Sequence, residues 1–442
     1  MNLYGWDTAF AIDVSLANRA LERAGDGLLV DFEATDPALG LSTAGAFGRW
    51  RIVEGGSGQF VNLRLPIVHG WLETAFSQRR VDLAGTAFVA TVALDLLPSV
   101  TRPAEQDLRF EVTTAARVGA APSPGAITPI RIDDPAQVLS DAEEALLLVA
   151  LAGFVAANGD RISFIFATIN LVPPSTNSWL TPVRSGFAYA DRSGGAGGAL
   201  VILSVTTDRE IGQLPRQVDP ALLSNAFQAG YAFSGALFLQ NVLMPALPAT
   251  FGNGATPRNF SFDSGAGQVV NVGALAMDQV KSGAIWYSPI VRSLTIGLNG
   301  STLAGRFDGD CDLKAGISMT FWVAPNNQIT YDASTRTLTF LADPNAPSGY
   351  TADIPWYWWF GGPLVRLIVE IVVRVISSSL AGKLTSSMAQ LMSPTRNPPT
   401  SIQWRETRDL LIGNAWVNGN FVMLGNFTDP AAPLPYRGEQ GD

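Results

Sequence analysis

The chain is poor in the residues that build disulfides, metal sites and histidine-dependent catalytic centres. Its 442 residues include one cysteine, Cys311, and one histidine, His69. A single cysteine excludes an intramolecular disulfide, and this pair gives too few ligands for a Cys/His zinc site. A Ser-His-Asp triad would have to use His69, and no G-x-S-x-G motif is present. We therefore expect no metal, no cofactor and no catalytic residues, so the chain is not expected to be an enzyme.

Charged residues are also scarce. They make up 15% of the chain, against roughly 25% in an ordinary soluble protein, while hydrophobic residues reach 47%. This composition excludes intrinsic disorder for the bulk of the chain. The 29 basic and 38 acidic residues give a net charge of −9, and no basic run is longer than the pair Arg79-Arg80. Binding to nucleic acid needs clustered cations, so we expect no nucleic-acid partner.

The sequence lacks a recognisable leader and a continuous apolar span. Residues 1–13 contain no Lys or Arg and include Asp7 and Asp13, unlike the basic start of a secretory signal. We therefore expect no cleaved signal peptide and a cytoplasmic location. The apolar run over 145–157 is shorter than the roughly 18 to 20 residues of a spanning helix. It is better interpreted as part of a buried helix.

Several segments have the capping and apolar pattern of helices. A first helix is expected from Asp7 or Thr8 to about Arg23. Three longer apolar helices are expected over residues 141–157, 221–244 and 364–384. Ser140 or Asp141 can cap the first of these, and Asp219-Pro220 can open the second. In the third, charges recur every four residues and form one narrow polar stripe, so we expect it to be wrapped by a sheet.

The remaining segments predict β-strands. Alternating or half-alternating apolar runs occupy residues 58–65, 86–94, 161–171 and 199–206, and the meander over 269–341 is the clearest β region. Neither a regular βαβ rhythm nor a fixed repeat is present. The best physical interpretation is an α+β fold in which long, curved antiparallel sheets wrap around a few long apolar helices. Such wrapping predicts an elongated molecule.

Two local features have structural explanations. The stretch 306–313 carries acids at alternate positions but lacks the glycine and glutamate of a calcium loop. As a strand, it places its charged residues on a solvated face and its apolar residues on a buried face. These two sets are Arg306, Asp308, Asp310 and Asp312 on one face, and Phe307, Cys311 and Leu313 on the other. His69 has no second catalytic group beside it except Glu73, so a structural or surface role is favoured.

Residues 356–360 are five consecutive aromatic residues. Such a run is typical of membrane interfaces or of the mouth of an apolar ligand site, and it also fits a plug of core at the end of a sheet. Apolar ligand pockets are lined by aliphatic and aromatic side chains, which the helices 141–157 and 221–244 supply. The predicted ligand-binding residues are Leu147, Leu151, Phe154, Phe227, Tyr231, Phe238, Trp356, Trp358 and Trp359.

Four motifs carry a family resemblance. They are Tyr4 to Ile12 (YGWDTAFAI), Phe166 to Leu171 (FATINL), Trp179 to Pro182 (WLTP) and Phe187 to Ala190 (FAYA). The sequence resembles the clostridial forty-seven-kilodalton accessory proteins encoded beside botulinum-type neurotoxins, over nearly the whole chain. This resemblance implies a TULIP (tubular lipid-binding) fold and carries no catalytic residues over to this chain. We expect one such domain over 1–430, or two lobes with a boundary near 120–140, followed by a flexible tail over 431–442.

The resemblance and the low charge together predict a function. The first hypothesis is non-enzymatic binding of lipid or another apolar small molecule, with peripheral membrane contact, by an accessory protein of a bacterial toxin or secretion gene cluster. The alternative is a protein-interaction or chaperone-like partner of a toxin complex, in which the apolar residues form only the core. Under either hypothesis, release together with a toxin complex is an alternative to a purely cytoplasmic location.

Overall fold

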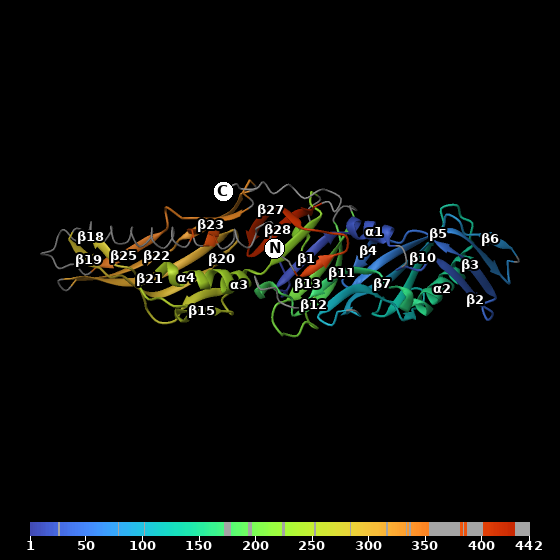
Figure 1. The fold of residues 1–442 in the computed structure, drawn as a ribbon, viewed down its shortest axis with the longest axis horizontal. Coiled ribbons are helices and arrows are strands. Elements are labelled where there is room, and N and C mark those ends of the chain that lie inside the picture. The colour runs from blue at the N-terminus through green and yellow to red at the C-terminus, as the bar shows by residue number, and fades with distance from the viewer. Residues whose placement is uncertain are drawn as a thin grey trace, which may run out of the picture. The chain divides into compact units, whose positions relative to one another are not determined.

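The computed structural model describes residues 1–24, 27–77, 79–100, 102–171, 178–192, 197–222, 226–251, 253–282, 284–314, 317–332, 334–335, 337–352, 381–382, 384–386 and 401–428. The chain forms two compact units. Figure 1 shows the fold, coloured by residue number from blue at the N-terminus to red at the C-terminus. We call Asn2–Tyr231, Pro399–Leu411 and Gly425–Asp442 the N-terminal unit. Met1, Ala232–Pro398 and Ile412–Leu424 form the C-terminal unit. Residues 120–140 lie inside the N-terminal unit.

The N-terminal unit contains most of the first half of the chain. Its elements are β1 (Thr8–Asp13), α1 (Val14–Arg23), β2 (Asp31–Asp36), β3 (Leu41–Phe47), β4 (Arg51–Ser57), β5 (Phe60–Thr74), β6 (Arg80–Asp82), β7 (Ala87–Pro98), β8 (Glu105–Glu111), β9 (Thr114–Ala115), β10 (Ala126–Asp133), α2 (Asp141–Ala157), β11 (Ile165–Asn170), β12 (Arg184–Asp191), β13 (Gly198–Val205) and β26 (Ile402–Trp404), with short 3-10 turns at Gly159–Arg161, Ser178–Leu180 and Pro220–Leu222. Its main sheet has the order β2-β3-β5-β7-β8-β11-β26, with β4, β6, β9 and β10 paired off this path. The pairings are antiparallel apart from β9 with β10. Strands β12, β13 and β1 form a second antiparallel set.

The C-terminal unit is built mainly on one antiparallel sheet of order β15-β16-β20-β21-β22-β25. Its elements are α3 (Gly235–Phe238), a π-helix (Leu239–Leu243), α4 (Met244–Phe251), a 3-10 turn (Pro257–Asn259), β15 (Phe260–Asp263), β16 (Gln268–Asn271), β17 (Leu275–Ala276), β18 (Val280–Ser282), β19 (Ile285–Tyr287), β20 (Ile290–Asn299), β21 (Thr302–Lys314), β22 (Ile317–Val323), β23 (Asn326–Asp332), β24 (Thr337–Leu341) and β25 (Ser348–Ala352). The chain passes between the units within β14 (Ala229–Phe233), β27 (Leu410–Asn418) and β28 (Asn420–Phe427).

The antiparallel β architecture is confirmed, whereas the expectation of long apolar helices wrapped by sheets is not supported. Residues 141–157 form α2, as predicted, and the meander over 269–341 is β as predicted. The predicted helix over 221–244 is wrong, because this range contains β14 and its α-helix begins only at Gly235. All five residues of β14 are buried. A strand that is buried on both faces shows no alternation and is easily mistaken for a helix.

The start of the first helix also differs from the prediction. Residues Thr8–Asp13 form β1, and α1 begins only at Val14. Asp13 caps α1, because its Oδ1 accepts a hydrogen bond from the backbone N–H of Ser15 at 2.7 Å. Of the predicted helix over 364–384, only residues 381, 382 and 384 are described, and all three are helical. Within the described residues, no helix combines the length and the apolar character needed to cross a membrane.

The strand interpretation of residues 306–313 is confirmed. They lie in β21, where Phe307, Cys311 and Leu313 are buried. Burial raises the pKa of the Cys311 thiol to about 11, so this thiol is inert at neutral pH. His69 is exposed on β5, which agrees with a surface role.

Helix α2 carries a buried carboxylate at its first turn, which pairs with the exposed Arg79. Glu143 is 1% exposed. Its Oε2 accepts hydrogen bonds from Arg79 Nη2 at 2.7 Å and from the Ser140 backbone N–H at 2.9 Å. In return, the Ser140 hydroxyl accepts a bond from the Glu143 N–H, which completes a capping box. The hydrogen bond from Arg79 is the main cause that lowers the pKa of Glu143 from 4.5 to about 2, against the opposing effect of burial.

This lowered pKa predicts a pH-dependent loss of stability in Glu143→Gln. Ionised Glu143 stabilises the fold above its ordinary pKa, and this contribution disappears as the pH falls from 4.5 towards about 2. We expect the variant to unfold with about 2 kcal/mol less free energy at pH 7, and the gap to wild type to close near pH 2. Urea unfolding of wild type and variant between pH 2 and pH 7 measures this difference in the free energy of unfolding. Asp141→Asn, an exposed acid on the same turn, is the control, and an equal gap at both pH values would contradict the assignment.

Candidate binding groove

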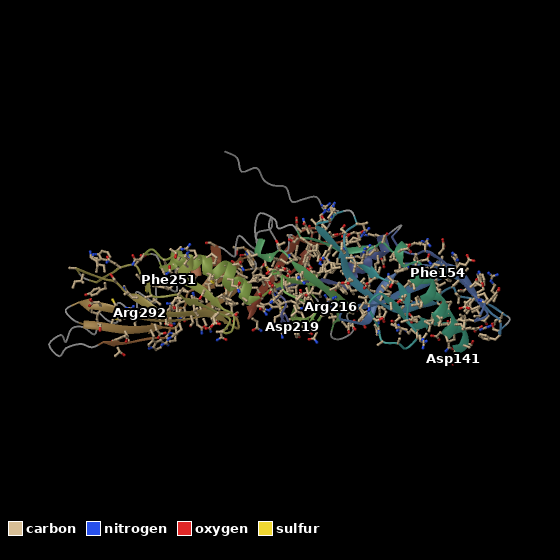
Figure 2. The ribbon with its side chains drawn as sticks, turned by 90° about the horizontal axis from the view of Figure 1, so that it is seen from below. Asp141, Phe154, Arg216, Asp219, Phe251 and Arg292 are labelled. Carbon is tan, nitrogen blue, oxygen red and sulfur yellow. The ribbon has the colours of Figure 1, made fainter. Side chains whose placement is uncertain are left out.

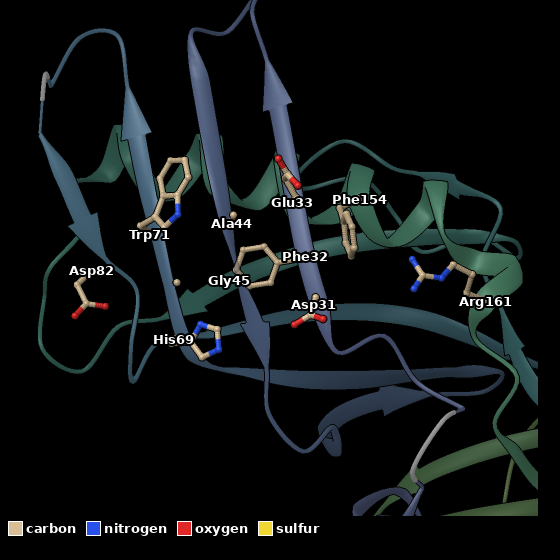
Figure 3. Close-up of a pocket in the computed structure, with 11 residues that line it drawn as sticks. Asp31, Phe32, Glu33, Ala44, Gly45, His69, Trp71, Asp82, Phe154 and Arg161 are labelled. Atoms are coloured by element: carbon tan, nitrogen blue, oxygen red, sulfur yellow. The ribbon is translucent and has the colours of Figure 1, made fainter.

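The outer face of β2, β3, β5 and β6 carries a groove in the N-terminal unit. The strands pair in register, so side chains from all four meet in rows across the sheet. One row runs Glu33, Ala44, Trp71, Asp82, and the next runs Asp31, Ala46, His69. Figure 3 shows these strands side by side, with helix α2 behind them. The groove encloses about 680 Å³ and also reaches Phe154 of α2 and Arg161 of the 3-10 turn that follows it.

The floor of the groove is a glycine pair. Gly45 of β3 lies opposite Gly70 of β5, and Phe32 of β2 is in the same row. A Cβ atom at Gly45 would lie 2.7 Å from the ring of Phe32 and 2.7 Å from the Cα of Gly70. The Phe32 ring therefore fills the space that two side chains would otherwise occupy. It also packs against Phe47 at 4.7 Å and Phe154 at 6.4 Å between ring centroids.

The walls of the groove are acidic. Asp31, Glu33 and Asp82 are exposed, and no ion pair joins them to a cation in the part of the chain that the structure describes. Arg161 is the guanidinium that lines the groove. Three carboxylates against one guanidinium give the groove a negative potential. It therefore favours a cationic ligand surface.

Trp71 gives the groove a half-buried aromatic wall. The guanidinium of Arg80 lies 4.0 Å from the centre of the Trp71 ring, and Arg80 also pairs with Glu73 at 3.6 Å. The Arg80 guanidinium is therefore held by Trp71 and Glu73 and does not pair with the three groove carboxylates.

The lining contains no hydroxyl, thiol or amine side chain that could act as a nucleophile. Nor do the described residues contain a cluster of three or more His, Cys, Asp or Glu side chains placed to hold a metal ion.

A second, smaller groove lies on the sheet of the C-terminal unit and differs in its charge. It encloses about 330 Å³ beside Trp322 and Tyr350. Its acids are already paired, because Arg292 binds Asp310 through two nitrogens and Arg306 binds Asp308 at 2.7 Å. Arg306 also stacks on Trp322 at 4.3 Å. We therefore take the groove of the N-terminal unit, whose acids have no ion-pair partner in the described part of the chain, as the candidate site.

The predicted ligand-binding residues occupy different surroundings. Figure 2 shows Asp141 and Phe154 at opposite parts of α2. Leu147 and Leu151 of α2 are fully buried, and Phe154 is half-buried and lines the groove. Phe227 is half-buried. Trp356, Trp358 and Trp359 lie outside the described residues.

Two further predicted residues lie in aromatic core clusters of separate units. Tyr231 is fully buried against Phe10 in the N-terminal unit, at 6.0 Å between rings. Phe238 stacks on Phe340 in the C-terminal unit, at 5.6 Å. Fully buried side chains with ring partners are part of the protein core.

Sequence analysis did not identify the groove residues other than Phe154. Asp31 and Glu33 flank an apolar residue with the alternation of a half-exposed strand, which is the one sequence signal that could have indicated them. The glycine pair could not be recognised, because the register that brings Gly45 opposite Gly70 is a property of the folded sheet.

Comparison with known proteins gives consistent results across sequence and structure. The family model OrfX-like, described as Protein OrfX2/OrfX3/P47, matches residues 3–335. Protein P47 of Clostridium botulinum (strain Kyoto / Type A2) is 25% identical over 437 residues, covering 96% of this chain and 100% of that protein. Protein OrfX3 of Paraclostridium bifermentans is 23% identical over 327 residues, covering 67% of this chain and 66% of that protein.

Two solved structures share the fold. The structure of P47 from Clostridium botulinum A2 matches with a TM-score of 0.72 and 24% identity, covering 96% of this chain and 98% of that one. The crystal structure of P47 of Clostridium botulinum E1 matches with a TM-score of 0.73 and 22% identity, covering 96% and 100%. The mostly antiparallel β architecture of this chain is therefore that of P47.

Proposed function

The chain belongs to the OrfX-like family of P47 and OrfX accessory proteins of clostridial neurotoxin clusters, and from this premise we propose that it is a non-enzymatic accessory protein that binds a partner protein. The observation that carries the proposal is the open groove whose three carboxylates have no ion-pair partner among the described residues. An exposed groove of one charge sign steers and orients a partner of the opposite sign.

The state of the predicted apolar residues supports the same proposal. Leu147, Leu151, Tyr231 and Phe238 are each fully buried by neighbouring side chains. Residues in this state supply the stability of the units and leave binding to the surface. This is the alternative in which the apolar residues serve only as core.

Binding of lipid, as in the tubular lipid-binding proteins, is the second candidate function. The observation that favours it is the hairpin β18–β19 of the C-terminal unit, where Ile285 and Trp286 are 42% and 50% exposed. The Lys281 ammonium lies 5.5 Å from the centre of the Trp286 ring. An exposed tryptophan beside a lysine is typical of segments that contact a membrane interface.

Native mass spectrometry separates the two candidates. The full chain is purified from its own host together with the proteins encoded beside it, and a parallel sample is extracted with organic solvent. We expect a stoichiometric complex with a neighbouring gene product, and an extract without lipid. Stoichiometric lipid on a chain that forms no complex would overturn protein binding and support the second candidate. Glu33→Gln is included. It is expected to weaken the complex at low salt, and its difference from wild type should shrink as the salt concentration is raised, because the groove acts by charge.

A further inference from the structure

Strand β2 is the edge of the main sheet of the N-terminal unit, and one side of its backbone is unpaired. The sheet order ends at β2, with β3 as its neighbour. The backbone N–H of Phe47 donates to the carbonyl of Val30 at 2.7 Å, which makes these two a hydrogen-bonded pair. In an antiparallel ladder such pairs recur at every second residue. The N–H and C=O groups of Asp31, Glu33 and Thr35 therefore point away from β3.

These outward groups are free to pair. Among the described residues, no backbone group hydrogen-bonds to the N–H or C=O of Asp31, Glu33 or Thr35 on the side away from β3. An unpaired strand edge is a template for one more strand. A partner segment that adds there gains main-chain hydrogen bonds along β2.

The side chains beside this edge alternate in character. The carboxylates of Asp31 and Glu33 are exposed on the outer face. On the inner face, Phe32 is buried and the half-buried ring of Phe154 lies beside it at 6.4 Å. In a strand added to β2, alternate side chains would lie on opposite faces of the sheet. One set would lie beside the acids of the outer face, and the other set beside the aromatic rings of the inner face.

We propose that the β2 edge binds an extended segment of a partner protein, in which basic residues alternate with apolar ones. This inference deepens the proposed function and rests on it, because it names the site and the chemistry of the partner. The basic residues pair with Asp31 and Glu33, and the apolar residues pack against Phe154. A second copy of this chain does not fit, since two β2 edges would place like charges opposite each other.

The test uses the full chain and short fluorescent peptides of defined pattern. One peptide alternates lysine with valine, a second alternates glutamate with valine, and a third is the lysine peptide with alternate backbone nitrogens methylated. Fluorescence anisotropy measures their binding. We expect the lysine peptide to bind and the glutamate peptide not to bind. Methylation is expected to weaken binding at least about tenfold, since several main-chain hydrogen bonds are lost together.

Two substitutions at one position separate backbone pairing from charge. Glu33→Pro removes an outward N–H and leaves the bonds to β3 in place, and proline is accepted on edge strands. We expect this variant to bind the lysine peptide about tenfold more weakly, because both an edge hydrogen bond and a charge are lost. Glu33→Gln keeps the N–H, so its affinity for the lysine peptide should fall by only about threefold. Glu210→Gln, an exposed acid outside the groove, should change nothing. Circular dichroism and thermal melting confirm that each variant is folded.

Hydrogen exchange provides a second readout. Amides within residues 29–37 should gain protection when the lysine peptide binds, since the outward N–H groups become paired. Equal binding by the methylated peptide, or equal losses in Glu33→Pro and Glu33→Gln, would overturn edge pairing. If the complex seen by native mass spectrometry persists in Glu33→Pro, the edge proposal fails while the proposed function stands. If no such complex forms in wild type, the proposed function itself fails.

Discussion

Gly45→Ala is expected to lower the free energy of unfolding of the protein by about 3 kcal/mol, because the new methyl group has no room. Its Cβ would lie 2.4 Å from the carbonyl oxygen of His69 and 2.7 Å from the Cα of Gly70. Both atoms belong to the backbone of β5, so the strand itself must move. The Phe32 ring closes the remaining direction at 2.7 Å.

Urea unfolding measures this loss, and another glycine of the same unit provides the control. Gly153 lies in α2 and a Cβ there would meet no atom within 4 Å. Gly153→Ala should therefore stabilise the protein by about 0.5 to 1 kcal/mol, through helix propensity alone. Stability of Gly45→Ala equal to wild type would show that β3 and β5 do not pair in this register.

Leu151→Ala is expected to cost about 2 to 5 kcal/mol, the usual effect of removing a buried leucine side chain. Leu151 is fully buried on the face of α2 that packs on the sheet. If Leu151 instead lined a site for apolar ligands, the wild-type position would be partly empty and its truncation would cost less. The measured loss therefore tests whether this residue is core or ligand site.

Val149→Ala is the matched control on the same helix. Val149 is 46% exposed, so its replacement should change the free energy of unfolding by less than about 0.5 kcal/mol. Thermal melting of both variants, with and without prior solvent extraction, completes the comparison. A small loss in Leu151→Ala, together with a drop in bound lipid, would contradict the assignment of this residue to the core.

The sequence carries enough information to predict the β architecture and α2, because their signals are local. Ser140, one of the two predicted caps, begins α2, and the alternation in β21 places Cys311 inside. The helix expected over 221–244 failed for a physical reason. β14 is buried at all five positions, so its sequence does not show the apolar and polar alternation that would identify a strand.

The groove could not be predicted because it depends on how distant strands align. Asp31, Trp71 and Asp82 share one face only through the register of four strands. The unpaired edge of β2 depends on the order of the whole sheet, which local propensity does not encode. Of the predicted ligand residues, Phe154 reaches the groove, and it does so from α2, a helix that was predicted correctly.

The last strand of the main sheet, β26, is synthesised long after the strand that it pairs with. β26 pairs with β11, with Ile402 opposite Ile169, and Trp404 is buried against Phe10 at 6.1 Å between rings. A growing chain therefore holds β11 as an open edge until the ribosome has released residue 404. During that interval the unfinished sheet is exposed to pairing with other chains. No single cut of the chain yields both units whole, since each is assembled from segments that the other interrupts.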